Sequence, residues 1–198
     1  MKPQTTLKEA LPVFYKNYNL KSDGGINDSS VKLEILKNFS LYIPNFETRK
    51  KIVLIHDIHH VVTGYKAVMK GETEISAWEL STGCMSNWFA FLINTYGMMS
   101  GILLNPIGVW RAWMRGRRTK NLYHEKYKME ALLNQTVEEL QKELALNNEK
   151  KSSSILGFLS FGGFLLFGVL FSIISIVLMP FVIGYSIFIS IKKPRITT

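Results

Sequence analysis

A stretch of forty residues without a charged side chain, from Ser152 to Ile191, constrains the fold of this chain more than any other feature. A single helix needs roughly twenty apolar residues to cross a bilayer, so this stretch is long enough for a span with residues to spare. The positive-inside tendency favours cytoplasmic placement of both basic flanks, which are Lys150-Lys151 and Lys192, Lys193 and Arg195. The pattern predicts a membrane-embedded helical hairpin. One tilted span with an interfacial extension and a buried pair of soluble helices are the alternatives.

The rest of the chain is long enough for one hydrophobic core, so we expect residues 1–150 to form one domain and residues 151–198 a membrane anchor. The net charge of +9 accompanies no recognised nucleic-acid motif, which favours an anionic membrane surface over DNA or RNA as partner. The single cysteine, Cys84, excludes a disulfide framework and a cysteine-based zinc site. No signal peptide is visible in the first twenty residues, so the domain is expected on the cytoplasmic side.

Apolar residues recur at helical spacing through most of the domain, and no alternating pattern convincingly indicates a strand. A helix is expected to begin at Asp28-Ser29-Ser30 and to run to Phe39, with Pro44 closing that region. Further helices are expected over 47–62, 72–91 and 134–146, and the uncharged stretch 80–110 is expected to give a buried core helix and a loop. The predicted fold class is therefore all-α, a compact helical domain followed by the membrane-embedded hairpin.

The sequence His56-Asp57-Ile58-His59-His60 is followed, after eleven residues, by Glu72. At about 100° per residue, His56, Asp57 and His60 share one face of a helix. The turn-like segment 63–65 allows the chain to double back and bring Glu72 opposite the imidazoles. Imidazole and carboxylate ligands together suit zinc or another borderline divalent ion. We therefore expect a metal site, with zinc as the first candidate, whose ligands are His56, Asp57, His60 and Glu72.

Two residues beside this set have less certain roles. His59 projects to the other side of His56 and is open to three interpretations, as a partner of a ligand, a spare ligand or a surface residue. Glu79 lies seven residues after Glu72 and therefore on the same helix face. Its carboxylate is a candidate to hold the second N–H of a ligating imidazole, or it is simply exposed.

Two further groups are candidates for ligand binding. Aromatic residues and methionines in the uncharged stretch either line a pocket for a long lipid tail, pack in the core, or face a membrane; they are Trp88, Phe89, Phe91, Tyr96, Met98 and Met99. The arginines Arg115, Arg117 and Arg118 suit the carboxylate of an aromatic acid or anionic lipid headgroups, unless they form an ordinary solvated helix.

The residues His56-Asp57, His60, 63–65 and Gly71-Glu72 resemble the signature of the coenzyme Q biosynthesis protein 4 family. A second block is similar to the carboxy-terminal region of that family; it comprises Arg115-Gly116-Arg117-Arg118, Asn121-Leu122, Tyr127 and residues 137–144. The resemblance covers residues 30–146. The chain departs from it at Gln141, where the family tends to have arginine, at Tyr127, where it often has tryptophan, and beyond residue 150, where the family usually ends.

The resemblance implies a late step of ubiquinone synthesis on a polyprenylated ring derived from 4-hydroxybenzoate. The expected role is removal of the ring carboxylate with hydroxylation there, or the organisation of other pathway enzymes. A metal would polarise the carboxylate while Arg115, Arg117 or Arg118 balance its charge. Expected partners are a polyprenylated quinone precursor or another isoprenoid lipid, the membrane, and other quinone-pathway enzymes or a second copy of the chain.

Two other functions fit the same residues. In a metal-dependent hydrolase, Asp57 would take the position of the general base, one methylene shorter than the usual glutamate. A phosphohydrolase would need further His or Asp ligands, and His124 and the few remaining candidates do not supply them. In a non-catalytic lipid-binding scaffold, the metal would only tie two helices together, and a closed set of four protein ligands favours that role.

Overall fold

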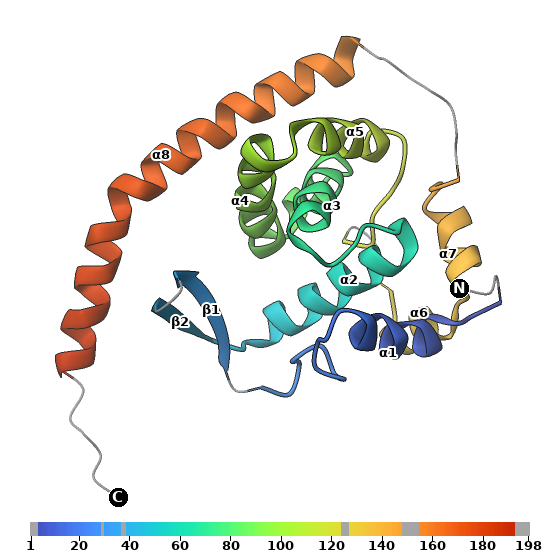
Figure 1. Ribbon diagram of the computed structural model, residues 1–198, viewed down its shortest axis with the longest axis horizontal. Helices are drawn as coiled ribbons and strands as arrows, with labels where there is room; N and C mark the ends of the chain where they lie inside the picture. Colours follow the sequence, from blue (N-terminus) through green and yellow to red (C-terminus); the bar gives the residue numbers. More distant parts are fainter. Residues whose placement is uncertain (1–3, 29, 37–38, 124–126, 148–154, 193–198) are drawn as a thin grey trace, which may run out of the picture.

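The computed structural model describes residues 4–28, 30–36, 39–123, 127–147 and 155–192, with the backbone alone over the strands and over 182–192. The expected contributors His124, Lys150, Lys151, Lys193 and Arg195 lie outside the described residues. The described chain is predominantly helical, so the predicted all-α class is confirmed, with one β-hairpin as an exception (Figure 1).

The centre of the domain is α3 (Met69–Ser81), which packs closely against α4 (Trp88–Leu104) and α5 (Pro106–Gly116). The helix α2 (Glu47–Thr63) lies beside this group, as Figure 1 shows. Its other side is covered by three short helices, α1 (Leu7–Asn17), α6 (Met129–Asn134) and α7 (Val137–Glu143). Buried residues of all these helices form one hydrophobic core, which holds α2 and α3 in a fixed relation.

The short helices α1 and α7 begin side by side, and each begins with the same capping arrangement. The Thr6 hydroxyl accepts a hydrogen bond from the Glu9 backbone N–H, and the Glu9 carboxylate accepts one from the Thr6 N–H. Thr136 and Glu139 repeat this capping box at α7. A bridge between Thr6 and Thr136 joins the two caps, so the start of the chain is fixed to its distant helix α7.

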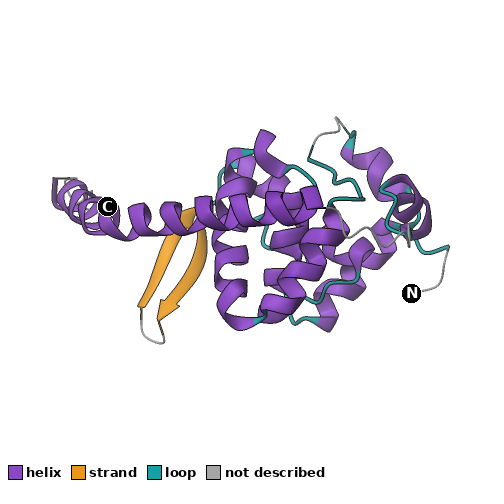
Figure 2. Ribbon diagram, turned by 90° about the horizontal axis from the view of Figure 1, so that it is seen from above, coloured by secondary structure: helices purple, strands orange, loops and turns teal. Residues whose placement is uncertain are grey.

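The prediction of a helix from Asp28 to Phe39 is wrong. Strands β1 (Ser30–Leu36) and β2 (Phe39–Pro44) form an antiparallel hairpin instead, and Figure 2 shows it projecting from the helical body. The misleading feature is that Val31 and Ile35 are four residues apart, a spacing that fits both a helix and an alternating strand. Val31, Leu33 and Ile35 in fact alternate with Lys32 and Glu34, and β-branched residues favour the strand.

The predicted hairpin of two membrane helices is also wrong. Residues Ile155–Lys192 form one continuous helix, α8, of 38 residues, with Pro180 inside it. A proline removes one backbone hydrogen bond but does not by itself reverse the chain, and no polar turn sequence accompanies it. The stretch Ile155–Phe181 has a mean hydropathy of 2.6 and is long enough to cross a membrane. Of the alternatives to the hairpin, one long helix is therefore the one that matches α8.

The helix α8 first passes over α5 and α4 and then extends away from the body (Figures 1 and 2). Aromatic side chains make this contact. The ring of Trp110 lies 5.0 Å from that of Phe161, and the ring of Tyr96 lies 5.4 Å from that of Phe171. Most of the described side chains of α8, those of residues 155–181, are nevertheless exposed.

The uncharged stretch 80–110 forms two helices and a turn, and not the expected helix and loop. The helix α3 ends at Ser81, a short 3-10 turn η1 spans Cys84–Ser86, and α4 and α5 follow. Asn87 and Asn105 break the apolar continuity of the sequence because each caps a helix, through hydrogen bonds from the N–H groups of Ala90 and Gly108.

Candidate metal centre

The turn between α2 and α3 brings the candidate ligands together. The helix α2 ends at Thr63 and is capped by Gly64, whose φ of 78° reverses the chain, as the segment 63–65 predicts. The following loop then packs directly on the start of α3, because Gly71 has no side chain there. A Cβ at Gly71 would overlap the carbonyl of Lys66 and lie 2.7 Å from its nitrogen. This close approach places Glu72 opposite the histidines of α2.

Three side chains then converge. The Nε2 atoms of His56 and His60 are 3.1 Å apart. The two carboxylate oxygens of Glu72 lie 3.3 Å from Nε2 of His56 and 3.2 Å from Nε2 of His60. Ligand atoms of the three residues all lie within 4.8 Å of one another, so His56, His60 and Glu72 could hold a metal ion. This set contains three of the four expected ligands.

The other ring nitrogen of each histidine is already engaged. Nδ1 of His60 donates to the backbone carbonyl of Tyr65 at 2.9 Å, and Nδ1 of His56 donates to Oε1 of Glu79 at 3.0 Å. In the neutral imidazoles, both Nε2 lone pairs therefore face the Glu72 carboxylate. Facing lone pairs repel unless a cation or a proton lies between them, and ligating histidines in proteins are commonly oriented through their second nitrogen in this way.

Glu79 is completely buried and organises the inner side of the site. Its carboxylate accepts hydrogen bonds from the rings of His56 and His59, from the amide of Asn94 and, at 3.0 Å, from the hydroxyl of Tyr123. Burial raises the pKa of this carboxyl, but the two histidines outweigh burial and hold the pKa below its ordinary range. Glu79 is therefore a buried anion in contact with His56, and the exposed alternative does not apply.

The same carboxylates act on His56 in return. Burial lowers the pKa of this imidazole, but Glu79 and Glu72 raise it well above its ordinary value, so the net shift is upward. The pKa of Glu72 is lowered to about 2, because its hydrogen bonds with His56 and His60 outweigh its burial. The pocket between the ligands is thus strongly attractive to a positive charge, whether a proton or a metal ion.

His59 is a structural partner of this network. Its Nδ1 donates to Glu79 at 2.6 Å, and its Nε2 accepts a hydrogen bond from the backbone N–H of Leu122 at 3.0 Å. Burial lowers the pKa of His59, consistent with this neutral ring. Both ring nitrogens are occupied, so of the three interpretations open for His59 only that of a partner fits.

Asp57 lies beside the three candidate ligands but does not belong to the set whose ligand atoms lie within 4.8 Å of one another. Its Oδ2 accepts a hydrogen bond from the hydroxyl of Tyr15 on α1 at 3.0 Å. One residue along a helix turns the side chain by about 100°, which directs Asp57 towards α1 while His56 and His60 face α3. Burial raises the pKa of Asp57 to about 6, although His56 and Tyr15 both act to lower it. The expected fourth ligand is thus a carboxyl group adjacent to a three-residue site.

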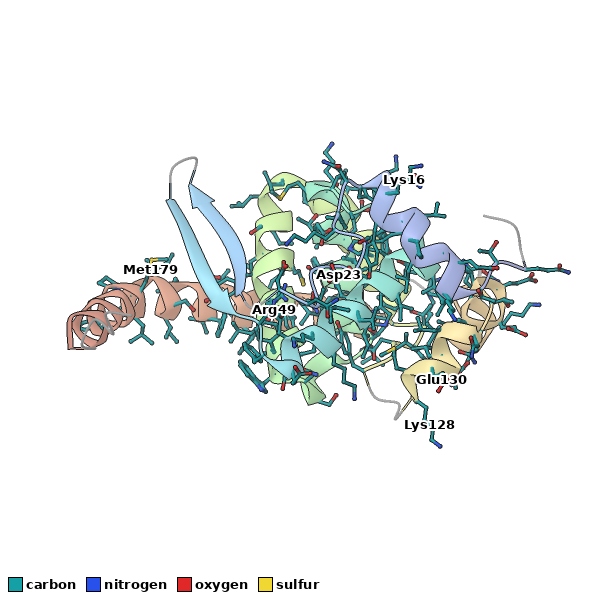
Figure 3. All side chains as sticks on the ribbon, turned by 90° about the horizontal axis from the view of Figure 1, so that it is seen from below. Lys16, Asp23, Arg49, Lys128, Glu130 and Met179 are labelled. Carbon is teal, nitrogen blue, oxygen red and sulfur yellow. The ribbon has the colours of Figure 1, made fainter. Side chains whose placement is uncertain are left out.

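A cavity of about 350 Å³ opens beside these residues and contacts His56, Asp57, His60 and Glu72 on one side. Its other side is formed by the loop 20–28 and by Arg49 of α2. Arg49 and Asp23 of this loop lie on the same side of the body in Figure 3. This wall was not predicted from the sequence, in which the turn-forming pair Gly24-Gly25 is its local signal.

Hydrogen bonds hold the loop over the cavity. The amide of Asn45 donates to the carbonyls of Gly25 and Asp28 at 3.0 and 2.7 Å, and its oxygen accepts from Arg49 at 2.7 Å. Lys21 pairs with Asp28 at 2.6 Å. The charge of Lys21 is thus balanced by Asp28, and Arg49, which is bonded to a neutral amide, brings positive charge to the wall that faces the candidate ligands.

The three expected substrate-binding arginines lie elsewhere. Arg115 donates to the carbonyl of Thr63 at 2.9 Å and stacks over the ring of Tyr65, so it supports the turn after α2. Arg118 donates to the carbonyl of Met114 at 3.1 Å. Arg117 lines a second cavity. None of the three is among the described residues that line the cavity at His56.

The aromatic residues and methionines that were expected to line one pocket likewise lie in different environments. Phe91 lines the second cavity, and Met98 is fully buried in the core. Trp88 is 63% exposed and Tyr96 is 41% exposed, so neither encloses a ligand within the domain. Of this group, Phe91 is the residue that lines one of the two described cavities.

Comparison with known proteins adds no relative to this description: no family model, no curated protein and no solved structure matches the chain. The chemistry of the site therefore rests on its own residues. Two imidazoles and one carboxylate could hold a metal ion, and the identity of such an ion is not fixed by these three residues.

Proposed function

We propose that the protein binds a divalent metal ion through His56, His60 and Glu72, with zinc as the first candidate, and acts in ubiquinone synthesis at a membrane. The observation that carries the metal site is the pair of Nε2 atoms 3.1 Å apart, each on a ring whose Nδ1 is already engaged. The resemblance of these residues to the coenzyme Q biosynthesis protein 4 family supports the pathway.

The proposed ligand is a polyprenylated aromatic acid, the intermediate that the resemblance implies. A cavity of about 350 Å³ falls in the range of roughly 300–1,000 Å³ for small-molecule sites, and it adjoins the candidate ligands. Arg49 takes the place of the expected arginines as the group that attracts the anionic ring, because the charge of Lys21 is balanced by Asp28. The apolar helix α8 supports membrane association, where a polyprenyl chain would reside, and we place the domain on its cytoplasmic side.

The bound metal would supply Lewis-acid polarisation of a carboxylate or phenolic oxygen. The side chains around it have separate tasks in this proposal. Glu79 orients His56 through Nδ1, and the loop 20–28 covers the cavity. Asp57, whose pKa is raised to about 6, holds or releases a proton at the edge of the site. In a scaffolding role, the same cavity would hold the lipid for another pathway enzyme or a second copy of the chain.

A metal-dependent hydrolase is the second candidate. Two histidines and a glutamate are also the ligands of several zinc peptidases, and Asp57 contacts the same cavity as a candidate base. The two functions differ in the ligand that remains bound. A polyprenyl-phenol recovered with the protein supports the quinone function, whereas metal-dependent cleavage of a peptide or phosphoester supports the hydrolase.

The test compares His60→Ala and Glu72→Ala with Glu74→Ala, a control that removes an acid from the same helix but outside the site. Metal content and co-purifying lipid are measured on detergent-purified full-length protein, and quinone production is measured in cells that depend on the chain. We expect the first two variants to lose metal and quinone production, and the control to keep both. Unchanged metal and quinone levels in His60→Ala and Glu72→Ala would refute the proposal.

A further inference from the structure

A second cavity of about 420 Å³ lies between the end of α3, α5 and α8. Its lining contrasts with that of the metal cavity. The walls are largely apolar and include Met85, Phe91, Trp113, Phe164 and Phe167. Arg117 is the single charged side chain among the described residues that line it. An apolar chamber with one cation matches an amphiphile better than a polar metabolite.

The membrane helix forms one side of this chamber. Phe164 of α8 lies 5.3 Å from the ring of Trp113, and Phe167 lies 5.7 Å from the ring of Phe91. Ser160 and Gly163 of α8 also line the cavity. Beyond the contact, α8 exposes apolar residues such as Leu166 and Leu170, which are 64% and 53% exposed. The cavity therefore lies against a helix that also carries exposed apolar side chains.

Arg117 lies where it could bind the charged headgroup of an amphiphile whose apolar part occupies the cavity. It follows directly after the last residue of α5, and its side chain is exposed. A guanidinium at the edge of an apolar cavity beside a membrane helix is suited to a phosphate headgroup, to which it can donate two hydrogen bonds. The net charge of +9 adds a general attraction to an anionic lipid surface.

We propose that this cavity binds one acyl chain of an anionic membrane phospholipid, with its phosphate paired to Arg117. The bound lipid fills the space between α8 and the helices α3 and α5, and so attaches the metal-binding domain to its membrane helix. The inference depends on the contact of α8 with the domain and is independent of the metal and of the quinone pathway.

Gly163 offers a direct test. A Cβ added there meets no atom within 4 Å, so Gly163→Phe should project into the cavity without a clash. Gly162→Phe is the matched control, because a Cβ there is equally free but the residue does not line the cavity. Delipidated full-length protein in detergent is titrated with phosphatidylglycerol or phosphatidylcholine, and bound lipid is counted by native mass spectrometry.

We expect the wild type and Gly162→Phe to bind one phosphatidylglycerol, and Gly163→Phe to bind it at least about tenfold more weakly. Arg117→Gln should lower the affinity for phosphatidylglycerol by a factor of about ten, the effect of losing a charge-assisted hydrogen bond. The preference for phosphatidylglycerol over phosphatidylcholine should then be lost. Three results would each overturn the proposal. They are equal lipid binding by both glycine variants, equal binding of the two lipids by the wild type, and no lipid bound to the wild type. Unchanged thermal unfolding temperatures and metal contents show that the variants are folded.

Discussion

Glu79, which is fully buried, accepts a hydrogen bond from Nδ1 of His56 at 3.0 Å. This contact fixes the ring so that its Nε2 faces Glu72, and it places a negative charge behind a candidate ligand. A buried carboxylate is costly unless it is fully hydrogen-bonded, and four donors satisfy Glu79. The site is therefore supported from the core outwards.

We predict that Glu79→Gln weakens metal binding by about 10- to 100-fold, the usual effect of removing a partner that orients a ligating histidine. The amide lacks the charge that favours a cation and cannot accept all four hydrogen bonds. Affinity is measured by competition with a chromophoric chelator. Glu74→Gln, on the same helix, is the matched control. Equal affinities for the two variants would show that Glu79 has only a structural role.

Asp57→Asn should retain the metal, because the Asp57 carboxylate is directed to Tyr15 and is not grouped with the ligands. A change of less than about threefold in affinity is expected, well below the effect of removing a zinc ligand. If Asp57 is the fourth ligand of the bound site, Asp57→Asn will instead lose metal as severely as His60→Ala.

Stabilisation of the protein by metal should increase with pH between 6 and 8. The pKa of His56 is raised, so its protonated form stabilises the metal-free fold below pH ~6.5, and this contribution is lost as the pH rises through the folded-state pKa. Metal binding requires the unprotonated ring and gains up to about 1.4 kcal/mol per pH unit for one displaced proton. Glu72, with its pKa lowered to about 2, stays ionised throughout this range.

The measurement is the difference in thermal unfolding temperature with and without zinc at each pH. His59 does not face the metal position, so its titration should affect both states alike. A difference that stays constant or shrinks from pH 6 to 8 would contradict proton displacement at His56.

Gly116→Ala should destabilise the domain by about 1–3 kcal/mol, the usual cost of overpacking. A Cβ at this position would overlap Oγ of Ser81 and lie 2.7 Å from the carbonyl oxygen of Trp78, so α5 would be pushed away from α3. Gly162→Ala, where a Cβ meets no neighbour, is the control. Thermal unfolding of both variants tests the contact, and equal unfolding temperatures would argue against it.

The ligand helix and its turn were predictable because their evidence is local. The spacing of His56 and His60 places them on one helix face, and Gly64 marks the reversal that returns Glu72 to them. The single core and the apolar carboxy-terminal helix likewise follow from the distribution of charged and apolar residues.

Other features depend on contacts between distant residues. Tyr15 reaches Asp57 across 42 positions in the chain, and no local pattern indicates that a tyrosine of α1 engages this carboxylate. Arg115 and Arg117 are two residues apart, yet one supports the turn after α2 and the other lines the second cavity. The strand at Val31 and Ile35 was missed because its spacing also satisfies a helix.

X-ray absorption spectroscopy at the zinc edge of metal-loaded, full-length protein tests the central claim most directly. The account predicts one zinc ion with two imidazole nitrogens at about 2.0–2.1 Å and oxygen ligands at about 2.0–2.2 Å. Both imidazole signals should weaken together in His56→Ala/His60→Ala. A spectrum without imidazole scattering, or one that is the same in this double variant, would contradict a metal held between His56, His60 and Glu72.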